Sequence, residues 1–524
     1  MLASIQSLTA LLGALALATL LAPRLRLPQP LALAFAGMAL AFVPSVRDLD
    51  IDPQVILVGF LPPLLYADAF RTSWRDFRRW LRPILMLAIG LVALTIVTVG
   101  FVAKWMLPSL PWSVCFVLGA IVSPTDTVAA QAVIERLRVP RRITAILGGE
   151  SMVNDATGLV GVQIGVVVTL HGMVHASTVA WQFAWVAGMG IVIGALCGVA
   201  FSFANRLVRD SSVLFTLSLL SPYLAYAAAD GFGGSGVLAV VVAGAIVAWR
   251  IHTIAPLTRL SLRASWDQLA FLLNGLCFLY IGLESPCLLH VAAGEGRSLW
   301  LAGLAVAGTV IVTRIVWCFP NAYVPLWLFP RLRAIEGGYP PLGGVVLASW
   351  CGVRGAVSLA AALALPTVTP EGLPFPGRAD VTACTLAVIL ATLFVQGATL
   401  HPLVKLLRFR DDGTTDSELR RAREQVLSAG IARLDAFCSE NSCPVAVHRY
   451  RESMVDQLAS LRADDDAERQ HAVHRLAVSL QVRAAVLEAQ ESALLRLRDG
   501  GQLDDLAFGA LLAELDHAVA AAAS

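Results

Sequence analysis

The densest polar run in any apolar stretch of this 524-residue sequence is Gly-Glu-Ser-Met-Val-Asn-Asp at 149–155. On a helix, which turns about 100° per residue, Ser151 and Asp155 lie one turn apart on one face, whereas Glu150 points about 140° away from Asp155. Carboxylate, hydroxyl and amide oxygens are ligands that a small hard cation prefers. We therefore expect Asp155, helped by Ser151, to bind a cation, while Asn154 lies on the adjacent stripe of the helix with Glu150. An internally satisfied polar seam between helices is the alternative.

A carboxylate in an apolar stretch can also hold a proton. Charge inside hydrocarbon is costly and is usually retained for function, and a carboxylate out of water binds its proton more tightly than in water. Asp155 can then hold a proton or a cation, but not both. That competition is sufficient for the exchange of one for the other.

Two more motifs carry helix-breaking residues within apolar stretches, Ser-Pro-Thr-Asp at 123–126 and Gly-Val-Arg-Gly at 352–355. A broken helix frees backbone carbonyls, which can join side-chain oxygens around an ion. We expect Asp126, directly after the first break, to tune the cation site or to neutralise the end of a half-helix. Kinks without function are the other interpretation, because Pro and Gly are common in membrane helices.

Two bases, Arg314 and Arg354, lie within apolar stretches. Arg354, at the second break, needs a carboxylate partner because leaving a buried charge alone costs several kcal/mol. Glu150 faces away from Asp155, so we expect Glu150 and Arg354 to form a structural ion pair.

The chain around these motifs is 57% hydrophobic and only 15% charged, whereas a soluble protein carries about a quarter charged residues. Runs long enough to cross a ~30 Å hydrocarbon core recur until about residue 406. The thirteen predicted spans are 2–22, 29–46, 53–70, 84–107, 112–134, 143–170, 177–204, 212–230, 235–251, 267–284, 298–320, 342–366 and 381–404. We expect an all-α polytopic membrane protein of two inverted repeats, whose interrupted fifth and twelfth helices cross at mid-membrane.

The loops on alternate sides of these spans differ in charge. Those on one side hold 21 Lys and Arg, and those on the other hold about 3. The richer side is expected in the cytoplasm. The N-terminus is then outside and the C-terminus cytoplasmic, in the cell (inner) membrane.

The transmembrane domain is predicted over 1–406 and a cytoplasmic helical tail over 407–524. Residues 411–524 hold 12 Arg, no Lys and 20 Asp or Glu, a formal charge of −8 that argues against a nucleic-acid partner. The tail is expected to be regulatory, or else a solvated appendage. Because the histidines of the first part lie at span ends and form no ligand cluster, an enzyme is disfavoured.

Five motifs in order resemble those of the monovalent cation:proton antiporter family 1, the sodium/proton exchangers. They are Leu-Pro-Pro-Leu-Leu-Tyr at 61–66, the first break at 123–129, the polar run at 149–155, Phe-Leu-Leu-Asn-Gly at 271–275 and the second break at 350–358. The resemblance covers residues 1 to about 406.

This resemblance implies a homodimer in the lipid bilayer that exchanges Na⁺ for H⁺ by alternating access, without a cofactor. It implies that Asp155 binds the Na⁺ with Ser151, Thr125 and Asn154 close by. The dipeptide Asn154-Asp155 is typical of electroneutral members. Li⁺ or K⁺ as the main substrate stays open, and a cation sensor that signals through the tail is the alternative of another class.

The sequence departs from the family pattern directly after the motif at 61–66, in the third predicted span. Many prokaryotic members have Glu directly after its aromatic residue, whereas here that place is Ala67 and the acid is Asp68. A shift of one residue turns the side chain by about 100°. We assign no binding role to Asp68 from the sequence.

Overall fold

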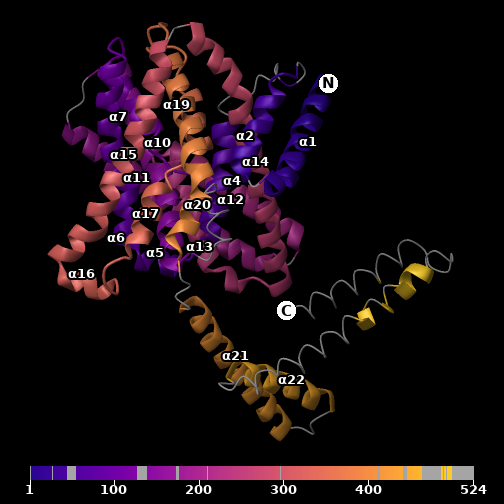
Figure 1. The fold of residues 1–524 in the computed structure, drawn as a ribbon. Coiled ribbons are helices and arrows are strands. Elements are labelled where there is room, and N and C mark those ends of the chain that lie inside the picture. The colour runs from indigo at the N-terminus through magenta and orange to yellow at the C-terminus, as the bar shows by residue number, and fades with distance from the viewer. Residues whose placement is uncertain are drawn as a thin grey trace. The chain divides into compact units, whose positions relative to one another are not determined.

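The structure is a computed structural model. It describes residues 2–25, 27–43, 46, 55–126, 139–172, 176–208, 210–294, 297–409, 414–440, 445–462, 485–487, 489–490, 492–497 and 511. Its contacts divide the chain into two units, Met1–Asp411 and Asp412–Ser524. The elements of the described residues are helices (Figure 1).

The first unit is a bundle of apolar helices. Up to the polar run they are α1 (Leu2–Leu25), α2 (Gln29–Leu40), η1 (Val55–Phe60), α4 (Leu61–Arg71), α5 (Trp74–Arg79), α6 (Leu81–Leu85), η2 (Met86–Leu91), α7 (Val92–Met106), α8 (Trp112–Ile121) and α10 (Arg141–His171). The remaining elements of this unit are α11 (Ala176–Leu207), α12 (Ser211–Gly231), α13 (Gly236–Trp249), the 3₁₀ turn η4 (Ile251–Thr253), α14 (Pro256–Gly294), α15 (Arg297–Leu328), α16 (Pro330–Ile335), α17 (Leu342–Trp350), α18 (Ala356–Leu363), α19 (Arg378–Thr392), η5 (Leu393–Gly397) and α20 (Ala398–Leu407). The π-helical segments η1, η2 and η5 adjoin the α-helices α4, α6 and α19.

Many of these helices are apolar enough to cross a membrane. Eight in the described part of the chain have the necessary length and composition, and α2, α8 and α13 are shorter apolar helices. Each of the thirteen predicted spans overlaps helical residues. The all-α membrane fold is therefore confirmed, while the number of spans and the inverted repeat stay predictions.

Both predicted helix breaks are present. Helix α8 ends at Ile121, and residues 123–126 leave the helical conformation. Residues 351–355 separate α17 from α18. The two breaks meet, because the Asp126 backbone N–H donates to the Val353 carbonyl at 2.8 Å. The crossing thus joins chain segments more than two hundred residues apart.

Helix α10, which carries the polar run, packs closely against the first break. It contacts α8, α13 and α4. A Cβ added at Gly158 would lie 2.5 Å from Cγ of Pro124, so only glycine allows this approach. The break is therefore held against the middle of α10.

The second unit contains α21 (Thr414–Glu440) and α22 (Val445–Arg462), which pack against each other. Arg451 pairs with Asp435 at 2.6 Å, and the Arg420 Nε donates to the Leu461 carbonyl at 2.6 Å. The described residues 414–440 and 445–462 of this unit are thus helical, while the predicted helical tail over 407–524 stays a prediction. Its predicted cytoplasmic and regulatory character stays a prediction.

Candidate functional site

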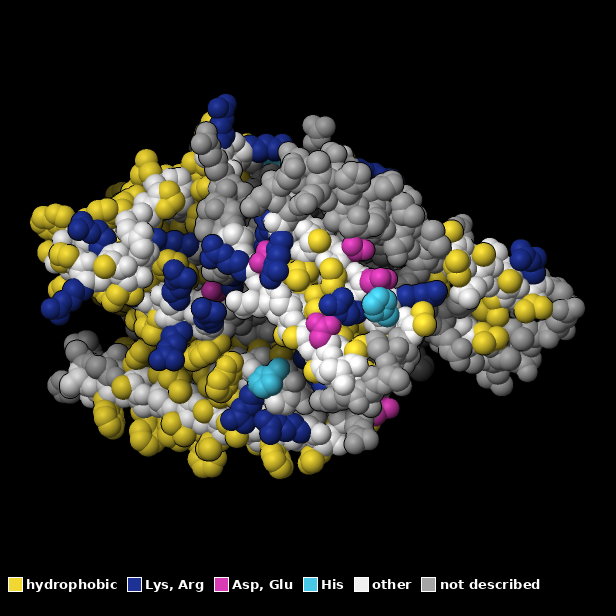
Figure 2. Space-filling model, turned by 90° about the horizontal axis from the view of Figure 1, so that it is seen from below, with side chains coloured by type: hydrophobic (Ala, Val, Ile, Leu, Met, Phe, Trp, Pro, Cys, Tyr) yellow, Lys and Arg dark blue, Asp and Glu magenta, His cyan; other side chains and the backbone are white. Residues whose placement is uncertain are grey.

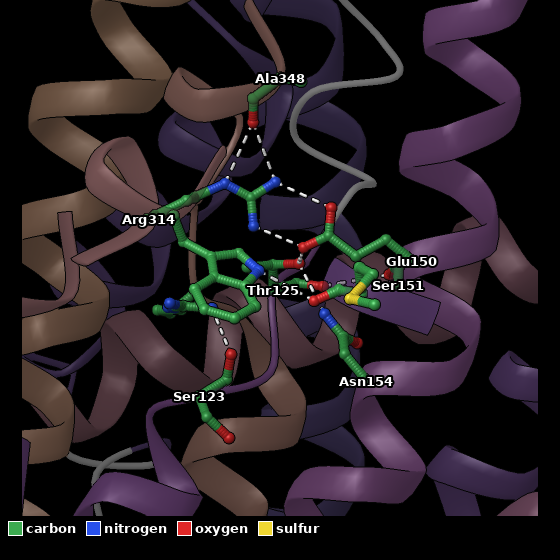
Figure 3. A network of polar contacts seen from close by, with 10 residues as sticks. Ser123, Thr125, Glu150, Ser151, Asn154, Arg314 and Ala348 are labelled. Atoms are coloured by element: carbon green, nitrogen blue, oxygen red, sulfur yellow. Dashed lines mark hydrogen bonds and ion pairs between the residues drawn. The ribbon is translucent and has the colours of Figure 1, made fainter. Parts of the chain in front are cut away.

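Thr125, in the extended segment after α8, is the centre of a buried hydrogen-bond network (Figure 3). Its Oγ1 accepts from Asn154 Nδ2 at 2.7 Å and donates to Glu150 Oε1 at 3.2 Å. Ser151 Oγ donates to the Thr125 carbonyl at 3.1 Å. The structure therefore brings together three of the residues that the sequence assigned to the cation site.

Asp155 lies beside this network on α10 and is only 7% exposed. It interacts electrostatically with Asp126, Asp68 and Arg354. Within the described residues its carboxylate has no ion pair, and the neighbouring Asn154 Oδ1 is buried without a hydrogen-bond partner. Oxygens of both side chains thus remain available to a cation.

Asp126 lies where the two helix breaks meet. Its backbone is bonded to Val353, and its side chain lies directly against Gly355, where an added Cβ would overlap the carboxylate. Asp126 is therefore a second acid at the break, as expected. Its carboxylate is near enough to Asp155 to act on it electrostatically.

The predicted ion pair between Glu150 and Arg354 is wrong. Glu150 instead forms a bidentate ion pair with Arg314 of α15. The Arg314 Nη1 donates to Oε1 at 2.5 Å and Nη2 donates to Oε2 at 2.8 Å. Both side chains are only 1% exposed. The Arg314 Nε and Nη2 also donate to the Ala348 carbonyl at 3.1 and 3.0 Å. Figure 3 shows the guanidinium between these two partners.

The geometry explains why Arg314 takes this place. Glu150 lies about 140° from Asp155 around α10 by its helical spacing, and the Arg314 side chain reaches it from α15. Gly352 leaves the room that the guanidinium needs, because a Cβ there would lie 2.7 Å from Arg314 Cδ. Arg314 was visible in the sequence as an intramembrane base. The sequence alone does not show that Arg314, and not Arg354, is the arginine that reaches Glu150.

Arg354 has a different role in the structure. Its Nη1 donates to the Ser123 carbonyl at 2.6 Å, and its backbone N–H donates to Thr392 Oγ1 at 3.1 Å. The Ser123 carbonyl follows the C-terminal end of α8, where the helix dipole and unpaired carbonyls favour a positive charge. Arg354 therefore neutralises a half-helix end. Its Nε and Nη2 have no hydrogen-bond partner within the part of the chain described.

Asp68 is the residue that the sequence reasoning left out. Ala67 is fully buried, whereas Asp68 of α4 is partly exposed and interacts electrostatically with Asp126 and Asp155. Arg71, one turn further on, pairs with Asp267 at 2.7 Å. The sequence did indicate an acid here, because Asp68 lies one place after the position at which many prokaryotic family members have Glu.

The transmembrane family of sodium/hydrogen exchangers matches residues 8–406, three quarters of the sequence. The chain belongs to the sodium/hydrogen exchanger family. It is similar to an uncharacterised Na⁺/H⁺ exchanger of Mycobacterium tuberculosis, 34% identical over 97% of this chain and 94% of that protein. It is also similar to an uncharacterised Na⁺/H⁺ exchanger of Escherichia coli, 30% identical over 94% of this chain and 93% of that protein.

Two further similarities concern substrates and fold. A sodium, potassium, lithium and rubidium/H⁺ antiporter of Bacillus subtilis is 28% identical over 91% of this chain and 72% of its own length. The structure of a sodium proton antiporter from Methanocaldococcus jannaschii matches with a TM-score of 0.61 at 20% identity, covering 78% of this chain and 100% of that one. This exchanger thus has that antiporter's fold. As a family member it is a membrane transporter rather than an enzyme, it exchanges cations for protons, and it uses no cofactor.

Proposed function

We propose that this exchanger carries Na⁺ against H⁺ by alternating access, with the cation and the proton competing for Asp155. The observation that carries the proposal is the buried Asp155 carboxylate, which has no ion pair among the described residues and lies beside the Thr125 network. A buried charge without a partner is costly unless a proton or a cation neutralises it. Occupancy by one or the other is therefore the stable condition of the site.

The hydrogen bonds indicate which oxygens the cation uses. Ser151 donates its proton to the Thr125 carbonyl, so the lone pairs of its hydroxyl remain free. Asn154 uses its amide N–H on Thr125 and keeps Oδ1 unpaired within the described residues. Asp155, Asn154 and Ser151 supply side-chain ligands, and Thr125 and Asp126 border the site from the broken helix. This set consists of hard oxygen donors, which suit Na⁺.

The charges around the site support electroneutral exchange. Glu150 and Arg314 neutralise each other, and Arg354 is committed to the end of α8. Asp155 is the site carboxylate that can trade a proton for a cation without disturbing either arrangement. One Na⁺ replaces one H⁺, so the loaded site carries the same charge in both directions.

The expected setting is a homodimer in the cell (inner) membrane, with the N-terminus outside and the C-terminus in the cytoplasm. The 21 to about 3 distribution of basic residues over alternate loops supports this orientation. The antiporter domain is proposed to end after residue 406, and the end of α20 at Leu407 supports this boundary.

Potassium/proton exchange by the same site is the second candidate. The similarity to a Bacillus antiporter named for sodium, potassium, lithium and rubidium favours a broad cation preference. A cation sensor that signals through α21 and α22 is a further alternative, and it requires no net transport.

The test is a fluorescence-dequenching assay in everted membrane vesicles, with Na⁺, Li⁺ and K⁺ added separately. Asp155→Asn should abolish the response to all three cations, because an amide cannot exchange a proton. Asp230→Asn, a change in an exposed acid at the end of α12, is the matched control and should respond normally. Normal exchange by Asp155→Asn would refute the proposal, and cation binding without any proton movement in the wild type would support the sensor.

A further inference from the structure

The end of α15 and the short helix α16 form an apolar and exposed arm. Trp327, Phe329 and Ile335 are 73%, 58% and 71% exposed. In Figure 1, α16 lies at the lower edge of the first unit, beyond the other helices. In a membrane transporter, side chains of this kind are stable where they contact acyl chains, and aromatic residues gather at the membrane–water interface.

Basic residues accompany this apolar arm. Arg331 and Arg333 of α16 are both exposed. Arg333 lies over the Tyr339 ring, with its guanidinium 5.5 Å from the centroid, and Arg331 has no ion pair among the described residues. An amphipathic segment with apolar side chains and arginines is typical of contact with an anionic lipid surface.

A second group of arginines is fixed next to α16. Glu336, directly after that helix, is 6% exposed and accepts from Arg82 Nε at 2.6 Å and from Arg142 Nη2 at 3.2 Å. Two guanidinium groups thus share one carboxylate, which leaves an excess positive charge. The buried Arg142 Nε has no hydrogen-bond partner within the described residues.

Trp80 holds this group in position. The Arg142 guanidinium lies 4.3 Å from its ring centroid, and that of Arg79 lies 5.4 Å from it. Stacking of this kind fixes the direction of a guanidinium without using its donors. Figure 2, which shows this end of the molecule, has Lys and Arg gathered over its middle with few acids among them, and apolar side chains along the rim.

We propose that this surface binds an anionic phospholipid. Arg331 and Arg333 hold the phosphate headgroup beside the Arg82–Glu336–Arg142 cluster, and the acyl chains lie along the exposed side chains of the α15–α16 arm. Charge complementarity selects an anionic headgroup, because Arg82 and Arg142 share the single carboxylate of Glu336 and the exposed Arg331 and Arg333 closely precede it in the chain. Guanidinium groups match phosphate in geometry as well as in charge.

The proposed lipid site is connected to the candidate cation site through helices α15 and α10. Helix α15 carries Arg314, and helix α10 begins at Arg141 and carries Glu150 and Asp155. Arg142 and Glu336 already connect the start of α10 to the segment after α15. A lipid held across these elements stabilises the arrangement in which Arg314 meets Glu150.

The full-length protein should be reconstituted in phosphatidylcholine vesicles with and without phosphatidylglycerol. Bound lipid is measured by native mass spectrometry after extraction, and the Tm is measured in parallel. The wild type should retain phosphatidylglycerol and gain Tm, whereas Arg331→Gln with Arg333→Gln should lose about thirtyfold in lipid affinity, at about 1 kcal/mol for each arginine near the surface. Arg331→Lys with Arg333→Lys should retain part of the binding.

A matched control variant distinguishes lipid binding at this site from lipid binding to exposed arginines in general. Arg206→Gln with Arg263→Gln removes two exposed arginines elsewhere in the first unit and should leave retention unchanged. Equal retention by the Arg331/Arg333 glutamine variant, or equal loss in the control variant, would overturn the proposal. Inorganic phosphate with phosphatidylcholine alone should give no gain in Tm, and a full gain would identify a free-phosphate site instead.

Discussion

Two acids five residues apart in α10 differ in role because they differ in partners. Glu150 is held by Arg314 through two short hydrogen bonds, and its charge is fully compensated. Asp155 has no such partner in the described residues and is instead influenced by other acids. A buried carboxylate that is paired stabilises the fold, whereas one left unpaired is available for exchange.

This difference predicts losses of stability of different size when each of the two arginines is removed. Arg314→Ala should destabilise the protein by about 3–5 kcal/mol, because it leaves the Glu150 charge buried and alone. Arg354→Ala should cost less, about 1–3 kcal/mol, because it leaves a carbonyl without its donor. The amount of folded protein in the membrane and the Tm in detergent measure both effects. A greater loss from Arg354→Ala would contradict the assignment of the pair.

Asp68 should influence cation affinity without being essential. Asp68→Asn removes a negative charge near Asp155, so the half-saturating Na⁺ concentration should rise about two- to tenfold while exchange continues. Vesicle assays over a range of Na⁺ concentrations measure this change. Asp230→Asn serves as the control, and an unchanged affinity in Asp68→Asn would show that the partly exposed acid is electrostatically screened.

At the scale of elements, the crossing depends on a close approach of the two breaks. Gly355→Ala places a methyl group against the Asp126 carboxylate, so one of the two extended segments must move. Exchange should fall at least tenfold, because small displacements of a positioned site are costly. Gly308→Ala on α15, where an added Cβ meets nothing within 4 Å, is the matched control. Equal activity of the two variants would show that the crossing tolerates displacement.

The elements also show what sequence could predict. Apolar length and helix-breaking residues are local properties, so the spans and both breaks were predictable. The contact of Thr125 with Asn154 and Ser151 followed from the motif resemblance. The partner of Glu150 did not, because Arg314 and Arg354 are both buried bases and only packing distinguishes them. The π-helical segments η1, η2 and η5 were also missed, since no residue type marks them.

At the scale of the whole molecule, the proposed competition of cation and proton for Asp155 predicts the pH dependence of exchange. As pH falls, Asp155 is increasingly protonated, and the cation must displace that proton. The half-saturating Na⁺ concentration should therefore rise by up to about tenfold per pH unit on the acid side and level off on the alkaline side, with the maximal rate little changed. Initial rates in proteoliposomes at matched internal and external pH measure it. A constant affinity with a falling maximal rate would indicate a proton site separate from Asp155.

The bond between the Asp126 amide and the Val353 carbonyl has a consequence for biosynthesis. During translation the first broken helix enters the bilayer long before its counterpart has been made. Thr125 and its neighbours then lack the segment 351–355 that meets the first break, and the Ser123 carbonyl lacks Arg354. A nascent chain that ends before residue 353 therefore cannot assemble the crossing. The candidate cation site is completed only when Val353 and Arg354, close to the end of the first unit, have been translated.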